Sequence, residues 1–374
     1  MTSLSIWFWQ RMVTPHMAFL AVSLADRGHQ VNYVAERKLD EDREALGWQV
    51  PDLPNVSLYF ASTAHEVERL VSLSLSSSVH LTQGFRSNGS VALAQRAIKA
   101  RGRRHFVIME TVDRRGPIGA LRRALYAWHL NRWRTGLDAV LAIGADTTTW
   151  VAQMAPANLK VFPFAYFLQD SEVSAPTLAG SPFRFLFVGA LVARKRVDLL
   201  LRCLSELSDQ SFEIEVIGDG PMRESLMRLA ADHLYDRATF SGVVPMNDVT
   251  DYMGRADCLV LPSDHDGWGA VVSEALMAGT PVICSSSCGA RDVVAASNAG
   301  GIFPTDNPTA LRNSLASVLA QGKVTSARRE RLRKWARSLG ANAGAEYLET
   351  ILRAVMSGTS RVAVVPWRGH NAVP

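Results

Sequence analysis

Two carboxylates with the spacing of a ligand-binding pair stand in the second half of the chain. Asp266 and Glu274 have seven residues between them, among which are Gly267 and Gly269. Glycine lets a ligand approach the backbone closely, because it carries no side chain. Ionised carboxylates only accept hydrogen bonds, so they suit neutral hydroxyls and would repel a phosphate. The pattern indicates a ligand with hydroxyls on both sides of whatever lies between the carboxylates.

The surrounding residues predict the elements that position this pair. Residues 259–261 form an apolar run of strand length, residues 264–269 a polar loop, and residues 270–278 a helix. Gly279 stands where a left-handed helix cap is expected, and Pro281 follows just beyond. The unpaired amides at the start of such a helix stabilise an anion. Hydroxyls on either side of an anion are the layout of a sugar nucleotide: sugar, diphosphate and ribose.

Residues 259–282 resemble the acidic-x7-Glu signature of retaining glycosyltransferase family 4. The shared elements are Pro-Ser, acidic-Gly-Trp-Gly and Glu-Ala-Leu-Met-Ala-Gly-x-Pro-Val, and the similarity extends over about residues 183–295. The first acidic position of that family is usually Glu and is Asp266 here. The resemblance implies an α/β fold of the GT-B type, with two doubly wound Rossmann-like domains facing a central cleft. It also implies sugar transfer with retention of the anomeric configuration.

The resemblance assigns roles to individual residues. Asp266 would hold sugar hydroxyls, Glu274 the ribose, and Lys195 the diphosphate. The family's arginine directly after Gly189 is replaced here by Ala190, and either Arg194 or Arg196 could supply the missing charge. Further candidates for substrate binding are Gly267, Trp268, Gly269, Ala270, Arg194, His16, Glu110, Gly218 and Val244.

The first half of the chain predicts a strand-helix-strand unit of the doubly wound kind over residues 4–35. No G-x-G-x-x-G lies in its first turn, so a bound dinucleotide cofactor is not supported. His16 is expected near the helix start, where it would contact an acceptor or a phosphate, or merely cap the turn. Glu110 follows a predicted strand at residues 105–109 and would contact the sugar or the acceptor, or be a solvated loop acid.

The length of 374 residues predicts two domains. Residues 1–168 are the acceptor-side domain, residues 169–182 a linker rich in Ser, Pro, Ala and Gly, and residues 183–349 the nucleotide-sugar domain. The tail, residues 350–374, is expected to pack back on the first domain, as the resemblance implies. Within this division, residues 139–143 are predicted to be the last strand of the first domain, and residues 328–355 to be largely helical.

Composition and cysteine spacing exclude some classes of protein and of site. The chain has 374 residues, of which 48% are hydrophobic and 20% charged, as in ordinary globular proteins. Its four cysteines form no zinc-ligand set with histidines, and buried free thiols are expected. The expected reaction needs no metal and no cofactor besides the donor.

The net charge of +5 is concentrated in one segment. Residues 86–134 carry twelve Lys or Arg and only two acids. Arginines alternate with apolar and aromatic residues over the predicted helix 119–134, including Trp128 and Trp133. This mixture suits an anionic membrane surface, or a solvated helix that docks by its aromatic side. Nucleic acid is a weaker interpretation, because no recognised binding motif accompanies the charge.

The N-terminus lacks the shape of a signal peptide, and no run of 18 apolar residues occurs. A cytoplasmic protein, possibly peripheral on the inner face of the cell membrane, is therefore expected. The predicted function is sugar transfer from a nucleoside-diphosphate sugar to a lipid-linked or polysaccharide-precursor acceptor. The alternatives are an inactive nucleotide-sugar-binding subunit, suggested by Ala190 and Asp266, and a sugar-nucleotide epimerase or phosphorylase of the same architecture.

Overall fold

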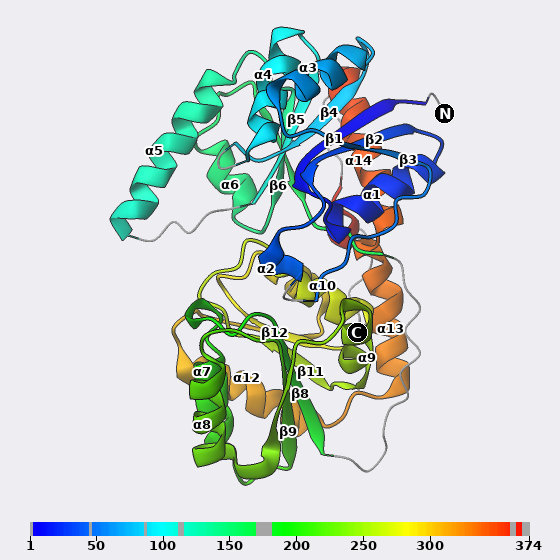
Figure 1. Cartoon of the computed structure of the whole chain (residues 1–374). Helices are drawn as coiled ribbons and strands as arrows, with labels where there is room; N and C mark the ends of the chain where they lie inside the picture. Colours follow the sequence, from blue (N-terminus) through cyan, green and yellow to red (C-terminus); the bar gives the residue numbers. More distant parts are fainter. Residues whose placement is uncertain are drawn as a thin grey trace. The chain divides into compact units, whose positions relative to one another are not determined.

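The computed structural model describes residues 3–44, 47–85, 88–110, 116–169, 182–359 and 364–368. The chain divides into two compact units, each built on one parallel sheet (Figure 1). The first unit comprises Met1–Glu41, Val50–Asp170 and Gly340–Pro366, and the second comprises Asp42–Gln49, Ser171–Leu339 and Trp367–Pro374. Most of the predicted linker, residues 170–181, lies outside the described residues.

The first unit contains a seven-stranded sheet in the order β3-β2-β1-β4-β5-β6-β7. Its strands are β1 (Ser5–Met12), β2 (Gln30–Arg37), β3 (Val56–Phe60), β4 (Val79–Gln83), β5 (Arg104–Glu110), β6 (Ala139–Ile143) and β7 (Lys160–Phe164). Every neighbouring pair is parallel. The chain leaves β1 toward β2 on one side and returns to β4 on the other, which is the doubly wound arrangement predicted from residues 4–35.

Helices cover both faces of this sheet, as parallel strands with continuous apolar runs require. They are α1 (Pro15–Asp26), α3 (Ala64–Leu73), α4 (Ser90–Ala100), α5 (Gly116–Arg132), α6 (Thr147–Ala152) and α14 (Ala341–Met356). All but the first residue of the short helix α2 (Glu41–Glu44) belongs to the second unit. Trp7 and Trp9 of β1 form a core with α3 and α4. Helix α14 packs beside α1, although more than 300 residues separate them in sequence (Figure 1).

One sequence prediction for the first unit is wrong. Strand β6 is not the last strand, because β7 pairs with it in parallel at the edge of the sheet. Pro163 lies in β7, where an edge strand tolerates a residue that has no amide to donate. Of the two tryptophans noted in the predicted helix 119–134, Trp128 is exposed and Trp133 is not. It is buried in a core formed with β5, β6 and α6.

The second unit contains a six-stranded parallel sheet in the order β10-β9-β8-β11-β12-β13. Its strands are β8 (Phe183–Val188), β9 (Phe212–Ile217), β10 (Ala238–Gly242), β11 (Cys258–Leu261), β12 (Val282–Ser285) and β13 (Gly300–Phe303). Its helices are α7 (Val197–Ser205), α8 (Arg223–Leu234), α9 (Met246–Arg255), α10 (Ala270–Met277), α11 (Arg291–Ser297), α12 (Pro308–Gln321) and α13 (Ser326–Ala336). All four cysteines are buried free thiols, as predicted.

Residues 328–355 are largely helical, as predicted, but they are divided between the two units. The last turn of α13 gives way to a 3-10 turn at Arg337–Leu339, and Gly340 is the N-cap of α14. The structure places Gly340–Pro366 in the first unit, whereas the sequence prediction kept residues up to 349 in the second domain. The helical periodicity continues across Gly340, so the pattern alone does not reveal where the chain changes unit.

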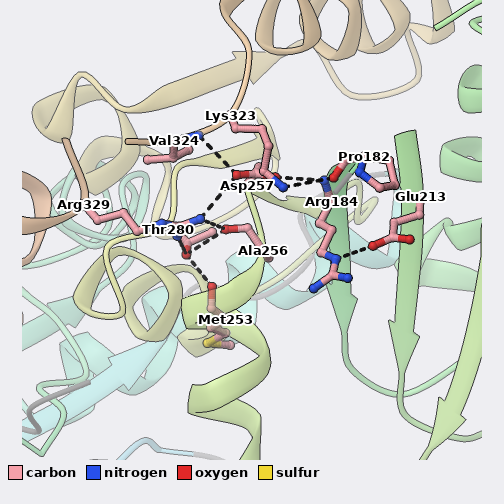
Figure 2. A network of polar contacts seen from close by, with 10 residues as sticks. All are labelled: Pro182, Arg184, Glu213, Met253, Ala256, Asp257, Thr280, Lys323, Val324 and Arg329. Carbon is pink, nitrogen blue, oxygen red and sulfur yellow. Dashed lines mark hydrogen bonds and ion pairs between the residues drawn. The ribbon is translucent and has the colours of Figure 1, made fainter. Parts of the chain in front are cut away.

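A buried ionic network stabilises the amino-terminal edge of the second sheet (Figure 2). Asp257, directly before β11, accepts hydrogen bonds from the backbone amides of Arg184 and Val324, at 3.0 and 3.1 Å. The guanidinium of Arg329 on α13 lies 3.3 Å from the same carboxylate and donates to the hydroxyl of Thr280 at 3.1 Å. Both charged groups are buried and therefore lack hydration by water. Each one compensates the charge of the other.

Candidate functional site

The candidate site of the second unit lies where the strand order reverses. The chain runs from β8 outward to β9 and β10, and then resumes at β11 on the other side of β8. Loops that leave the carboxyl ends of β8 and β11 therefore diverge, which is where ligands bind in open α/β sheets. Lys195 follows β8 and Asp266 follows β11. The topology brings these two residues together from positions 71 apart in sequence.

Lys195 and Asp266 form a buried ion pair. The ammonium lies 3.0 Å from each carboxylate oxygen, and Arg194 donates to the same carboxylate at 3.3 Å. Burial would by itself raise the pKa of Asp266, but the attraction of Lys195 and Arg194 and the hydrogen bonds to the carboxylate together outweigh it, and the pKa lies below its usual value. Asp266 is therefore ionised at neutral pH, and the three side chains together carry one net positive charge.

The loop around Asp266 is held by the loop that follows β12. The amide of Gly289 donates to the carbonyl of Asp266 at 2.9 Å, and the amide of Ala290 donates to the carbonyl of Trp268 at 2.8 Å. A Cβ atom at Gly289 would lie 1.9 Å from the carbonyl oxygen of Gly267. Only glycine permits this close approach, so the backbone of the Asp266 loop is fixed by a residue from a different loop.

Helix α10 begins immediately after this loop. Gly269 is its N-cap with φ of 87°, a left-handed conformation that glycine adopts without strain, and Ala270 is the first helical residue. No side chain caps this end. The first amides of a helix generally have no intrahelical acceptor. Here the amide of Val272 donates to the carbonyl of Gly269 at 2.9 Å, which leaves the amides of Ala270 and Val271 as candidates to meet an anionic ligand. A Cβ atom at Gly269 would lie 2.9 Å from Cδ2 of Leu261 and 3.0 Å from Sγ of Cys288, so glycine also lets the start of α10 pack closely against these two side chains.

Glu274 is on the second turn of α10 and is half-buried. Burial raises the pKa of its carboxyl from 4.5 to about 7, and no neighbouring charge or hydrogen bond within the described residues offsets that effect. Glu274 thus differs from Asp266, which has a cationic partner. An unpartnered carboxyl near a ligand site is expected to gain hydrogen-bond donors when the ligand binds.

Arg194 and Arg196 have different environments. Arg196 has φ of 52° and directs its guanidinium to carboxylates from other loops, with Nη1 3.0 Å from both Asp264 and Asp306. The side chain of Arg194 is 55% exposed and reaches the rim of the Lys195–Asp266 pair. Arg194 is therefore the arginine whose charge remains available at the site. Arg196 instead connects its own loop to the loops that contain Asp264 and Asp306.

Two further sequence candidates of this unit lie at neighbouring strand ends. Gly218 follows β9 with φ of 129°, and a Cβ there would lie 2.0 Å from the carbonyl oxygen of Gly189. It therefore allows the loops after β8 and β9 to approach closely. Val244 follows β10 and is half-buried. Both residues lie at the same sheet edge as Lys195.

The remaining two candidates, His16 and Glu110, belong to the first unit. His16 is the second residue of α1 and is buried, with its ring stacked on Tyr166 at a centroid distance of 4.8 Å. Glu110 ends β5 and is half-buried. Both therefore lie at the carboxyl edge of the first sheet.

Sequence reasoning missed one residue at the site. Trp367, in a short 3-10 turn at Pro366–Arg368, is buried with its ring 6.2 Å from that of Trp268. Trp268 also donates from its indole nitrogen to the hydroxyl of Ser273 on α10, at 3.2 Å. The only signal was the apolar run at residues 362–367, in a tail that otherwise has no period.

Among the described residues, no group of three or more His, Cys, Asp or Glu is arranged to hold a metal ion. Over the same residues, every helix is too short or too polar to cross a membrane.

Comparison with known proteins gives a family match in the second unit. Residues 169–339 match the family model of the glycosyl transferases group 1. The 2-deoxystreptamine glucosyltransferase of Streptomyces kanamyceticus is 34% identical over 111 residues, 29% of each chain. A GDP-mannose-dependent phosphatidylinositol monomannoside mannosyltransferase of Mycolicibacterium smegmatis is 28% identical over 156 residues, 39% of this chain and 41% of that protein. The chain thus matches less than half the length of these relatives.

Solved structures match nearly the whole chain. The lipopolysaccharide outer core galactosyltransferase WaaB superposes with a TM-score of 0.69 at 16% identity, covering 95% of this chain and all of that one. Anabaena HepE in complex with UDP superposes with a TM-score of 0.70 at 16% identity, covering 94% of this chain. At such identity the likeness concerns the fold, and it confirms the GT-B architecture.

Proposed function

Because residues 169–339 carry a group 1 glycosyl transferase domain and the chain has the GT-B fold, we propose that the protein transfers a sugar from a nucleoside-diphosphate sugar to an acceptor. The observation that supports this most directly is the buried Lys195–Asp266 pair beside the start of α10. A cation, a hydrogen-bond acceptor and free helix amides then lie at one topological switch point, as a diphosphate flanked by hydroxyls requires.

The proposed roles follow from the charges. Lys195, Arg194 and the amides near Ala270 stabilise the diphosphate as it departs. Asp266 accepts hydrogen bonds from the sugar, and Glu274 accepts them from the ribose. Arg194 supplies the charge that Ala190 does not provide, because Arg196 is engaged by carboxylates. Catalysis then comes from positioning and from electrostatic stabilisation of the leaving group, with retention of configuration and without a protein nucleophile.

The same proposal includes no cofactor other than the donor and no metal. The acceptor is proposed to be lipid-linked or a polysaccharide precursor, which is supported by relatives and structural neighbours named for phosphatidylinositol mannosides and lipopolysaccharide. The 2-deoxystreptamine transferases among the relatives make a soluble aminocyclitol the second candidate acceptor. Release of the nucleoside diphosphate in the presence of each acceptor class distinguishes the two, and chelator controls test the metal.

The experiment is a thermal-shift panel of nucleoside diphosphates and their sugars, followed by transfer assays on folded variants. Lys195→Ala and Glu274→Ala should each weaken nucleotide binding by about 1.5–3 kcal/mol, the range for hydrogen bonds to charged groups. Lys334→Ala is the matched control, because Lys334 is exposed on α13.

Each outcome of this experiment has a defined meaning. Normal affinity and normal transfer in both site variants would contradict the assignment of these residues. Binding without transfer to any acceptor would support the inactive-subunit alternative. Conversion of the donor without an acceptor would support an epimerase.

A further inference from the structure

The tail of the chain returns to the second unit at one buried residue. Helix α14 and the residues up to Pro366 belong to the first unit, and Trp367 is the first residue after α14 that belongs to the second. Trp367 is 5% exposed, although it lies in a 3-10 turn of three residues. It also lies outside residues 169–339, which match the family model, so the family match assigns it no role.

Trp367 packs on Trp268, which lies between two glycines of the Asp266 loop. The two ring centroids are 6.2 Å apart, and the ring planes are inclined at 58°. Trp268 is itself 3% exposed. Gly267 and Gly269 give the backbone on either side of Trp268 more conformational freedom than other residues would. The Trp268 side chain is therefore the part of this loop that packing can fix.

Trp268 also contacts two other elements of the second unit. Its indole nitrogen donates to the hydroxyl of Ser273 on α10 at 3.2 Å. Its carbonyl oxygen accepts from the amide of Ala290 at 2.8 Å and from the thiol of Cys288 at 3.2 Å. Both of these residues belong to the loop between β12 and α11. Trp268 thus connects α10, that loop and the tail, and a displacement of its ring would disturb all three contacts.

The groups proposed to meet the donor lie close to Trp268 in sequence. Asp266 precedes Trp268 by two residues, and Ala270 and Val271, whose amides are candidates to meet the diphosphate, follow it directly after Gly269. A shift of Trp268 would therefore move the Asp266 carboxylate and the start of α10 together. Binding groups tolerate little displacement, because the contribution of positioning to catalysis depends steeply on distance.

We infer that Trp367 is a positioning residue for the donor site, because it holds Trp268 and through it the Asp266 loop. This inference rests on the proposed function. Arg368, the next residue, pairs with Asp292 on α11 at 3.7 Å, but its side chain is 68% exposed. An exposed ion pair contributes little, whereas a buried tryptophan removes a large apolar area from water. The burial of Trp367 is therefore the main attachment of this turn to the second unit.

Hydrogen–deuterium exchange of the unliganded full chain tests this inference without reference to sugar transfer. Two amides report on the loop, because those of Gly289 and Ala290 donate to the carbonyls of Asp266 and Trp268. Trp367→Ala should speed exchange at both amides by at least about tenfold, because it makes local opening easier. Trp367→Phe keeps an aromatic ring against Trp268 and should restore most of the protection. If the alanine variant does not fold, Trp367→Leu takes its place.

Two controls separate positioning from a general loss of stability. Phe212 is 3% exposed and lies at the amino end of β9, so Phe212→Ala removes a buried aromatic residue at the opposite edge of the sheet. It should leave exchange at Gly289 and Ala290 unchanged. Trp268→Ala should speed exchange at both amides. Adding Trp367→Ala to that variant should change nothing further, because the contact is already lost.

Steady-state kinetics then connect the loop to the donor. In an active wild type, Trp367→Ala should lower kcat/KM for the sugar nucleotide by about 10- to 100-fold, as a displacement of about 1 Å can do. Trp367→Phe should recover most of this loss. Phe212→Ala should leave kcat/KM close to the wild-type value, since it leaves the Asp266 loop in place.

Each result has a defined consequence. Unchanged exchange at Gly289 and Ala290 in Trp367→Ala would overturn the inference, and so would faster exchange with wild-type kinetics. Equal effects of Phe212→Ala would also overturn it, since the tail would then have no special role. A wild type that neither binds nor transfers a nucleotide sugar would contradict the proposed function, and the exchange measurement would still decide whether the tail holds the loop.

Discussion

The pKa of Glu274 predicts how nucleotide binding depends on pH. Burial raises that pKa to about 7, so about one tenth of the carboxyl groups are ionised near pH 6 and about nine tenths near pH 8. If only the ionised form accepts hydrogen bonds from the ribose, the affinity for a nucleoside-diphosphate sugar should rise about tenfold over this interval. Isothermal titration calorimetry across the pH range measures this change directly. The sugar nucleotide is the better probe, because it lacks the terminal phosphate that ionises in free nucleoside diphosphates.

Glu274→Gln is the decisive variant. It keeps the size of the side chain but cannot ionise, so its affinity should be lower at about pH 8 and should lose the tenfold change. If wild type and variant show the same pH dependence, another group titrates and the ribose assignment fails.

The free energy of unfolding should change with pH in the opposite direction to the affinity. The folded pKa lies above the unfolded value of 4.5, so wild-type stability is lost as pH rises from that value to about 7. The loss approaches about 3 kcal/mol, and the unliganded variant should melt higher near pH 8.

Three further predictions concern other parts of the chain. Asp266→Asn should slow sugar transfer while leaving the affinity for free nucleoside diphosphate equal or tighter, because Lys195 is no longer neutralised. An equal loss of both in calorimetry and transfer assays would contradict the sugar role. Asp257→Ala should lower the unfolding free energy by about 3–5 kcal/mol in urea titrations, since it leaves a buried arginine unpaired. Glu206→Ala, on an exposed pair, should cost no more than about 0.5 kcal/mol. Burial lowers the pKa of His80 to about 3, so stability should be lost as pH falls below 6.5, and His80→Asn should flatten this loss in thermal melts.

Much of the fold could be predicted from local pattern. The apolar runs that became β1 and β11 are strand-length and bounded by polar or breaking residues. Gly279 adopts φ of 81°, as a left-handed cap after α10 requires. Strand β7 was missed because Pro163 reads as a break, and only the position of a strand in the sheet shows that an edge tolerates proline.

The residues of the candidate site could be predicted from the sequence, but most of the contacts between them could not. The loop around Asp266 carries a long local motif, so its residues could be named from sequence. The ion pair of Asp266 with Lys195 depends on loops from strands that are far apart in the chain. So does the difference between Arg194, whose charge is available at the site, and Arg196, which pairs with Asp264 and Asp306. The contact of Trp367 with Trp268 is also non-local, and no periodicity in the tail predicts it.

The amino-terminal and carboxyl-terminal ends of the strands in the second sheet carry different groups of residues, and this affects how the unit could change over evolutionary time. Asp257 and Arg329 anchor the amino-terminal edge, while the residues proposed to meet the donor lie on loops at the other edge. Substitutions in those loops leave the anchoring network in place. The unit could therefore acquire a different sugar preference by changes at the carboxyl edge without losing the contacts that hold its strands and α13 together. Laboratory selection for a new donor should accordingly enrich substitutions in the loops after β8, β9 and β11, and should leave Asp257 unchanged.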